Sequence, residues 1–425
     1  MRYTPIDPQL FIENRKKFVN LLHKDSFAFF CSSDHYPSSA DGLLPFYQDS
    51  DFFYLTGWQK PNSFLLLFPE ALDIEEQEIL FVPQIDEKTA RWEGAGLTLE
   101  AIQKLTGITR IAFNDELSFY LKKFFATTTS VYLNSNEHLR ATSKVITATD
   151  RWNLELKQNF PLHQVQRSAP LLRKLRMQKD PLEIALIQKA IQITELGFRK
   201  VMQLLKKPIY EYEIEAEFIY LFTKHQADGF AYHPIIGAGQ NSCVLHYNDN
   251  KNFCQAQEIV LLDVGAAYAH YNADITRVFP VGGRFSKRQQ QVYRAVLRVK
   301  NFAESLLKPG ILLKTYQQQV ILQMQEELLQ LELLTTAQIK ENPKAYQRYF
   351  MHGTSHFLGL DVHDVGDIQI PLMEDAVVTV EPGIYIPEEN LGIRLEDNIW
   401  VRSEKNVNLS QNIPILIEEL EELMH

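Results

Sequence analysis

The chain has 425 residues, of which 45% are hydrophobic and 23% charged, and its formal net charge is −10 at pH 7. A chain of this length exceeds one ordinary hydrophobic core, so we expect two domains. The composition is typical of a soluble globular protein. The negative charge argues against a nucleic-acid-binding surface, which is normally basic, and is compatible with a cation site built from acidic residues.

Cysteine usage and hydropathy indicate the cellular environment. The three cysteines, Cys31, Cys243 and Cys254, are far apart and form no Cys-x-x-Cys pair. This pattern argues against a disulfide framework or a thiolate zinc site and favours a reducing compartment. The N-terminal segment MRYTPIDPQLFIENRKKF lacks the apolar core of a secretory signal, and no apolar run approaches the roughly 18 residues that span a bilayer. We predict a cytoplasmic location, with no membrane or nucleic-acid partner.

Residues 1–170 are predicted to form a mixed α/β domain. Short apolar runs at residues 26–33, 63–70 and 77–84 are typical of strands, and residues 115–125 are typical of a helix. The basic, proline-containing segment 166–185 is interpreted as a linker. We therefore place the second domain at residues 171–425.

The second domain is predicted to contain the same order of helices and strands twice. Asp180, Pro181 and Glu183 form a helix start, with a cap, a first-turn proline and an acid that can reach back to the cap amide. Ser286 and Gln289 have the same capping spacing before a second helical run. The predicted order is a helix from 181, a helix at 212–225, strands within 258–283, helices at 286–307 and 315–334, and strands at 376–386 and 391–401. Two helices followed by a hairpin, twice over, predict a pseudo-duplicated α+β domain.

Three histidines, His352, His356 and His363, lie in the stretch MHGTSHFLGLDVHDVG. A zinc-protease helix requires His-Glu-x-x-His, but Gly353 follows the first histidine and further glycines disfavour a rigid helix. Packing in the core would explain one of these histidines but hardly all three. The stretch is therefore interpreted as one part of a larger site.

Four carboxylates interrupt or end strand-like aliphatic runs. Asp263 lies in IVLLDVG and Asp274 follows eleven residues later, while Glu381 ends VVTV and Glu396 lies in IRLED. Strand periodicity places Arg394 and Glu396 on one face. A single such acid is most simply an exposed strand residue, but a buried ionised carboxylate is costly unless it is paired or bound to a cation. Four acids with one imidazole suit two divalent ions such as manganese, cobalt or zinc.

The set Asp263, Asp274, His356, Glu381 and Glu396 resembles the five-ligand dinuclear site of the pita-bread metallopeptidases. This family includes methionine aminopeptidases, prolidases and Xaa-Pro aminopeptidases. The N-terminal segment YQDSDFFYLTGWQKPNSFLLL resembles the creatinase-type N-domain of Xaa-Pro aminopeptidases, which methionine aminopeptidases lack. The resemblance therefore extends over nearly the full chain.

The resemblance implies a role for each ligand. Asp263 and Glu396 would bridge two divalent ions, most simply Mn²⁺, with Co²⁺ or Zn²⁺ as alternatives. Asp274 would bind one ion, and His356 and Glu381 the other. Glu381 would also move a proton from the attacking water to the leaving proline nitrogen.

The resemblance also assigns residues around the metals. His363 would contact the scissile carbonyl oxygen, and His352 and His246 would line the substrate pocket. Arg394 would brace the site through a carboxylate and Tyr385. The implied activity is removal of the N-terminal residue from peptides with proline in second position.

Alternatives remain within and outside the family. A prolidase shares every ligand, but the segment 367–375 contains no lysine or arginine to hold the free carboxylate of a dipeptide. A non-catalytic peptide- or histone-binding protein and a metal-free creatinase-like hydrolase typically lose ligands that are present here. The family also implies a homodimer or homotetramer, in which Trp92 of one subunit would reach the active site of another.

Overall fold

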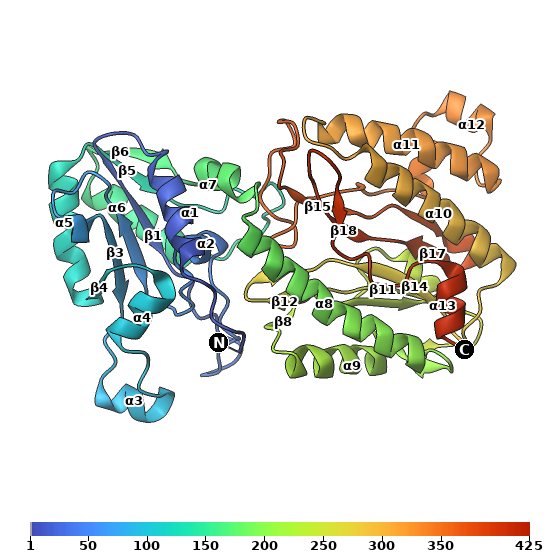
Figure 1. The fold of residues 1–425 in the computed structure, drawn as a ribbon, viewed down its shortest axis with the longest axis horizontal. Coiled ribbons are helices and arrows are strands. Elements are labelled where there is room, and N and C mark those ends of the chain that lie inside the picture. The colour runs from blue at the N-terminus through green and yellow to red at the C-terminus, as the bar shows by residue number, and fades with distance from the viewer. Residues whose placement is uncertain (1) are drawn as a thin grey trace. The chain divides into compact units, whose positions relative to one another are not determined.

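A computed structural model describes residues 2–425, apart from the side chain of Glu93 (Figure 1). The chain divides into two compact units, Pro5–Arg176 and Met177–His425, and the second unit also includes the first residues of the chain. The domain boundary expected after residue 170 stays a prediction. Among residues 2–425, none of the helices combines the length and apolarity needed to cross a membrane.

The first unit is built on one mixed sheet with strand order β4-β3-β2-β1-β5-β6. The strands are β1 Ser26–Cys31, β2 Phe64–Leu67, β3 Glu78–Val82, β4 Arg110–Phe113, β5 Ser130–Leu133 and β6 Gln164–Arg167. The helices are α1 Gln9–Val19, α2 Ser50–Thr56, α3 Glu87–Glu93, α4 Leu99–Thr106, α5 Leu117–Thr127, α6 Ala148–Asn159 and α7 Ala169–Arg176. β1 pairs with β2 on one side and β5 on the other, and all its residues are buried. A strand covered on both faces explains the continuous apolar run SFAFFC.

The predicted strands and helix of this unit are confirmed, but the linker prediction is wrong over Ala169–Arg176. That segment forms helix α7, and its Leu172 is fully buried. Pro170 occupies the first turn, where a missing backbone N–H costs no helical hydrogen bond. Only residues 177–180 separate α7 from the next helix.

Six helices belong to the second unit. They are α8 Pro181–Leu204, α9 Glu211–Lys224, α10 Lys287–Leu306, α11 Leu313–Gln330, α12 Thr336–Glu341 and α13 Ile417–Leu423. Both predicted helix starts are confirmed: Asp180 caps α8 with Glu183 reaching back, and Ser286 and Gln289 do the same for α10. α8 packs on α9 and on strand β12 (Ala266–Tyr268), while α10 packs on α11 and on strand β17 (Leu391–Arg394) (Figure 1).

The strands of the second unit form two sets with the same nested pairing. In the first set, β11 Ile259–Asp263 pairs with β14 Thr276–Pro280, and between them β12 Ala266–Tyr268 pairs with β13 Tyr271–Asn272. In the second set, β15 Val377–Val380 pairs with β18 Asp397–Trp400, and between them β16 Gly383–Ile386 pairs with β17 Leu391–Arg394. The remaining strands are β7 Ile209–Tyr210, β8 Gly229–Phe230, β9 Ile235–Ala238, β10 Phe253–Cys254 and β19 Val407–Asn408. The order of helices and nested strands repeats, which confirms the predicted pseudo-duplication.

Candidate metal centre

The four acidic candidates lie at the junctions between outer and inner strand pairs. Asp263 is the last residue of β11 and Glu381 directly follows β15. Asp274 lies two residues before β14, and Glu396 directly precedes β18. The nested pairing explains how carboxylates far apart in sequence reach one region.

The five predicted ligands come together around His356. Single donor atoms of Asp274, His356 and Glu396 all lie within 4.8 Å of one another. His356 Nε2 lies 3.3 Å from Asp274 Oδ2 and 3.6 Å from Glu381 Oε1. Asp263 joins the group through the Tyr232 hydroxyl, which lies 2.5 Å from Asp263 Oδ1 and 2.7 Å from Asp274 Oδ1.

The orientation of His356 suits metal binding. Its Nδ1 lies 2.9 Å from the carbonyl oxygen of Phe357, which can only accept a hydrogen bond, so Nδ1 carries a hydrogen and Nε2 faces the acids. Burial acts to lower the pKa of His356, but Asp274 and Glu381 outweigh it and raise the pKa to about 9. The acids therefore favour the protonated, positively charged form of the His356 ring.

The carboxyl pKa values reflect crowding in a buried space. Burial raises the pKa of Glu396 well above its usual range, and the neighbouring acids raise it further. Burial likewise raises the pKa of Asp263, and it raises that of Glu381 to about 7. For Asp274 burial also acts to raise the pKa, but the hydrogen bond and charge of His356, the hydrogen bond from Tyr232 and the charge of His363 together outweigh it, and the pKa is lowered. Ionising all four acids requires a compensating positive charge.

The oxygen atoms of the site outnumber the protons available to them. Glu396 Oε1 is buried and has no hydrogen-bond partner within residues 2–425. One hydroxyl proton of Tyr232 cannot serve Asp263 and Asp274 at the same time. Carboxylate oxygens with one imidazole form a donor set that suits Mn²⁺, Co²⁺ or Zn²⁺. The residues present therefore fit a divalent metal.

Arg394 links the acids to the predicted pocket. It is 4% exposed, and its Nη2 donates to Asp263 Oδ2 at 2.6 Å while its Nη1 donates to the Tyr385 hydroxyl at 2.8 Å. The same hydroxyl lies 2.8 Å from His352 Nε2, and burial lowers the pKa of His352 to about 4. A chain of contacts thus runs from Asp263 through Arg394 and Tyr385 to His352.

The other two candidate histidines are exposed. The His363 ring packs edge-on against His356, with centroids 4.5 Å apart and an interplanar angle of 88°. The charge of His246 acts on His352 and contributes to lowering the pKa of His352. Both positions suit contact with a substrate, and the roles assigned to them stay predictions.

Sequence reasoning missed three side chains that contact the ligands: Tyr232, Thr276 and Asn398. The Thr276 hydroxyl donates to Glu396 Oε2 at 2.7 Å, and Asn398 bonds to the backbone of Asp274. Strand periodicity was a usable signal for Thr276 and Asn398, because each lies two residues after a candidate ligand. No motif marks Tyr232, which lies 31 residues from Asp263.

Two family models match the chain. Residues 185–403 match metallopeptidase family M24, and residues 11–132 match the aminopeptidase P N-terminal domain. The chain belongs to metallopeptidase family M24. This M24 chain is accordingly a metallo-hydrolase, and family membership implies divalent metal binding, in keeping with the donors around His356.

Relatives of this M24 metallopeptidase are similar over nearly its whole length. The Xaa-Pro aminopeptidase of Haemophilus influenzae is 34% identical, covering 98% of this chain and 97% of the relative. The Xaa-Pro aminopeptidase of Escherichia coli is 32% identical, with 99% and 98% covered. The solved structure of E. coli aminopeptidase P with the inhibitor Pro-Leu has a TM-score of 0.87 at 30% identity and covers 99% of each chain. The predicted fold, an aminopeptidase P N-domain with a pita-bread catalytic domain, is confirmed.

Proposed function

We propose that this M24 metallopeptidase removes the N-terminal residue from peptides that carry proline in second position. The full-length similarity to Xaa-Pro aminopeptidases carries this proposal, because it includes the N-terminal domain as well as the catalytic one. The five donor side chains converge in the same region, which supports a catalytic rather than a purely binding role.

The proposed cofactor is a pair of divalent ions, most simply Mn²⁺, with Co²⁺ or Zn²⁺ as alternatives. Asp263 and Glu396 would bridge the two ions, Asp274 would bind one, and His356 and Glu381 the other. A solved structure of zinc-substituted E. coli aminopeptidase P with product, similar to this chain with a TM-score of 0.85 at 30% identity, supports a metal-dependent site.

The protein side chains would perform the remaining steps. Bound metal ions supply Lewis acidity and a water of lowered pKa. Glu381 would accept a proton from the attacking water and pass it to the leaving proline nitrogen. His363 would donate a hydrogen bond to the scissile carbonyl oxygen as negative charge develops there. His352, held by Tyr385, and His246 would line the pocket.

The choice of aminopeptidase over prolidase rests on the segment 367–375. This segment contains no basic residue, and Arg402, which contacts it, is already paired with Asp375 and lies 3.8 Å from Glu374. A prolidase needs a free cation to hold the carboxylate of its dipeptide substrate. We therefore expect a peptide that continues beyond proline to be accepted.

A peptide comparison tests the proposed specificity. The Mn²⁺-loaded protein is incubated with Gly-Pro-Leu, Gly-Pro and Gly-Ala-Leu, and released glycine is measured by chromatography. We expect Gly-Pro-Leu to be cleaved at least as efficiently as Gly-Pro, and Gly-Ala-Leu to show a much lower kcat/KM. An Asp263→Asn variant is the inactive control. Cleavage of the dipeptide alone would assign the chain as a prolidase, and inertness toward all three would favour a binding role.

We also propose a homodimer or homotetramer in which Trp92 contacts a neighbouring subunit. In support, Trp92 lies on α3 and is 84% exposed, so it is not part of the core of its own unit. Sedimentation velocity of wild type and Trp92→Ala tests this assembly, and a strict monomer at all concentrations would contradict it. The cytoplasmic location and the domain limits 1–170 and 171–425 stay predictions from sequence.

A further inference from the structure

Two buried polar residues follow candidate acids in the two strand sets. Thr276 lies two residues after Asp274 at the start of β14, and Asn398 lies two residues after Glu396 in β18. Both Thr276 and Asn398 are 0% exposed.

Each of these residues bonds to the acid of the other strand set. The Thr276 hydroxyl donates to Glu396 Oε2 at 2.7 Å, and the Thr276 carbonyl accepts the Glu396 N–H at 3.1 Å. The Asn398 Nδ2 donates to the Asp274 carbonyl at 2.5 Å, and its Oδ1 accepts the Asp274 N–H at 3.2 Å. The side chain of Asn398 thus bonds to the backbone N–H and carbonyl of Asp274, while Thr276 bonds to the carboxylate and the backbone N–H of Glu396.

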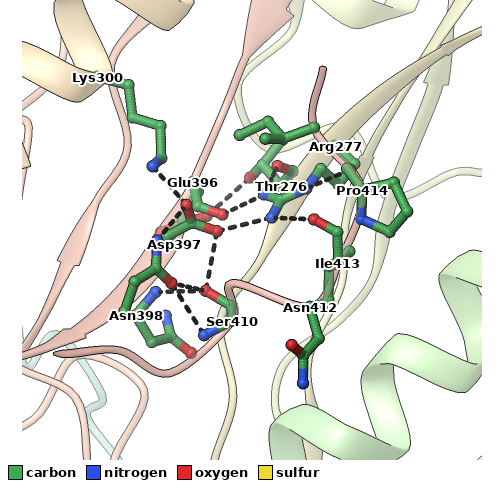
Figure 2. Close-up of polar contacts among 12 residues, drawn as sticks. Thr276, Arg277, Lys300, Glu396, Asp397, Asn398, Ser410, Asn412, Ile413 and Pro414 are labelled. Carbon is green, nitrogen blue, oxygen red and sulfur yellow. Dashed lines mark hydrogen bonds and ion pairs between the residues drawn. The ribbon is translucent and has the colours of Figure 1, made fainter. Parts of the chain in front are cut away.

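A buried network of ion pairs and hydrogen bonds joins β14 to β18 next to these contacts (Figure 2). Arg277 Nη1 donates to the Glu396 carbonyl at 2.6 Å, and its Nη2 donates to Asp397 Oδ1 at 2.7 Å. Lys300 Nζ lies 2.5 Å from Asp397 Oδ2, so two cations meet one carboxylate. Because Arg277 is in β14 and Asp397 in β18, this network keeps Thr276 and Asn398 from separating.

We propose that Thr276 and Asn398 form a reciprocal clasp, as positioning residues that hold Asp274 and Glu396 at ligand distance before a metal binds. The physical need is that Asp274 and Glu396 belong to different strand sets, so contacts between these sets fix the spacing of the two acids. A clasp built into the strands removes the reorganisation that metal binding would otherwise require. The inference rests on the proposed metal-dependent function.

Metal affinity is the quantity that the clasp should change. Mn²⁺ binding to the metal-free full-length chain is measured by titration calorimetry for wild type, Asn398→Ala, Thr276→Val and Thr276→Ser. We expect the first two variants to bind Mn²⁺ about 10-fold or more weakly, as is usual for residues that orient metal ligands. Thr276→Ser keeps the hydroxyl and should bind as wild type does. The Mn²⁺ concentration for half-maximal cleavage of Gly-Pro-Leu should rise in parallel with the dissociation constant.

A matched control separates positioning from general loosening of the fold. Arg298→Met breaks an ion pair that joins α10 to Glu327 on α11, whose side chain is 1% exposed. Neither Arg298 nor Glu327 is one of the candidate ligands. This variant should melt at a lower temperature but bind Mn²⁺ as wild type does. If Asn398→Ala does not fold, Asn398→Ser, whose hydroxyl is too short to hold both backbone groups, takes its place.

The outcomes separate the clasp from the proposed function. Wild-type affinity in both Asn398→Ala and Thr276→Val, or an equal loss in Arg298→Met, would overturn the clasp. A wild-type chain that binds no Mn²⁺ and cleaves no Xaa-Pro peptide would overturn the proposed function instead.

Discussion

Replacing Lys179 by Met should strongly destabilise the second unit. Lys179 Nζ lies 2.9 Å from Asp364 Oδ2, and both side chains are 1% exposed. Methionine keeps the apolar stem of lysine but removes its charge, so Asp364 would be left buried with its main cation missing. Removing one partner of a buried ion pair typically costs about 3–5 kcal/mol, because the remaining charge is uncompensated.

The expected loss is large enough for calorimetry. For domains of about 150–250 residues, 1 kcal/mol shifts Tm by about 2–4 °C, so Tm should fall by roughly 6–20 °C. The exposed Lys189 on α8 is the matched control, and Lys189→Met should change the free energy of unfolding by less than about 0.5 kcal/mol. The double variant Lys179→Met with Asp364→Leu removes both charges and should recover most of the loss.

The pair also has a functional consequence, because Asp364 directly follows His363. Loosening this chain segment should lower kcat for Gly-Pro-Leu while the Mn²⁺ dissociation constant stays close to that of wild type. A Tm within about 2 °C of wild type would refute the reasoning about the buried charge. A double variant no more stable than Lys179→Met would refute it as well, since the unpaired carboxylate would then not be the cause.

Three further predictions concern the site and the thiols. His363→Ala should keep its metal but lose about 10²-fold or more in kcat, as for removal of an oxyanion donor, and loss of metal on elemental analysis would show that the role is misassigned. Asp263→Asn should lose metal and activity together, because an amide cannot supply the bridging negative charge, and a metal-replete but inactive variant would contradict this assignment. Burial raises the pKa of all three cysteines, to about 12 for Cys31 and Cys254, but only Cys243 is partly exposed, so at pH 8 a thiol reagent should modify Cys243 slowly and the other two not at all in the native protein. Mass spectrometry showing rapid labelling of either buried cysteine would count against the packing described here.

The candidate ligands could be predicted from sequence because carboxylates conflict with the aliphatic residues around them. Asp263 and Glu381 end strands made of aliphatic residues, and such acids need a partner or a cation. The same conflict recurs at equivalent points of both strand sets. Local capping signals likewise gave the starts of α8 and α10, because a cap involves residues only a few positions apart.

What escaped prediction depends on contacts between distant segments. Lys179 and Asp364 are 185 residues apart, and no motif near either residue indicates that they pair. Tyr232 lies in a loop without a motif, yet its hydroxyl reaches two of the acids. The charged, proline-containing sequence of α7 is typical of a linker, and the burial of its Leu172 depends on contacts that the sequence does not show.

The dependence of peptide cleavage on bound metal tests the central claim most directly. Wild-type protein is stripped with a chelator, its metal content is measured by elemental analysis, and Gly-Pro-Leu cleavage is followed as Mn²⁺ is added back. We expect no turnover without metal, and recovery that saturates as the content approaches two ions per chain. Full cleavage by a chain shown to be metal-free would contradict the account.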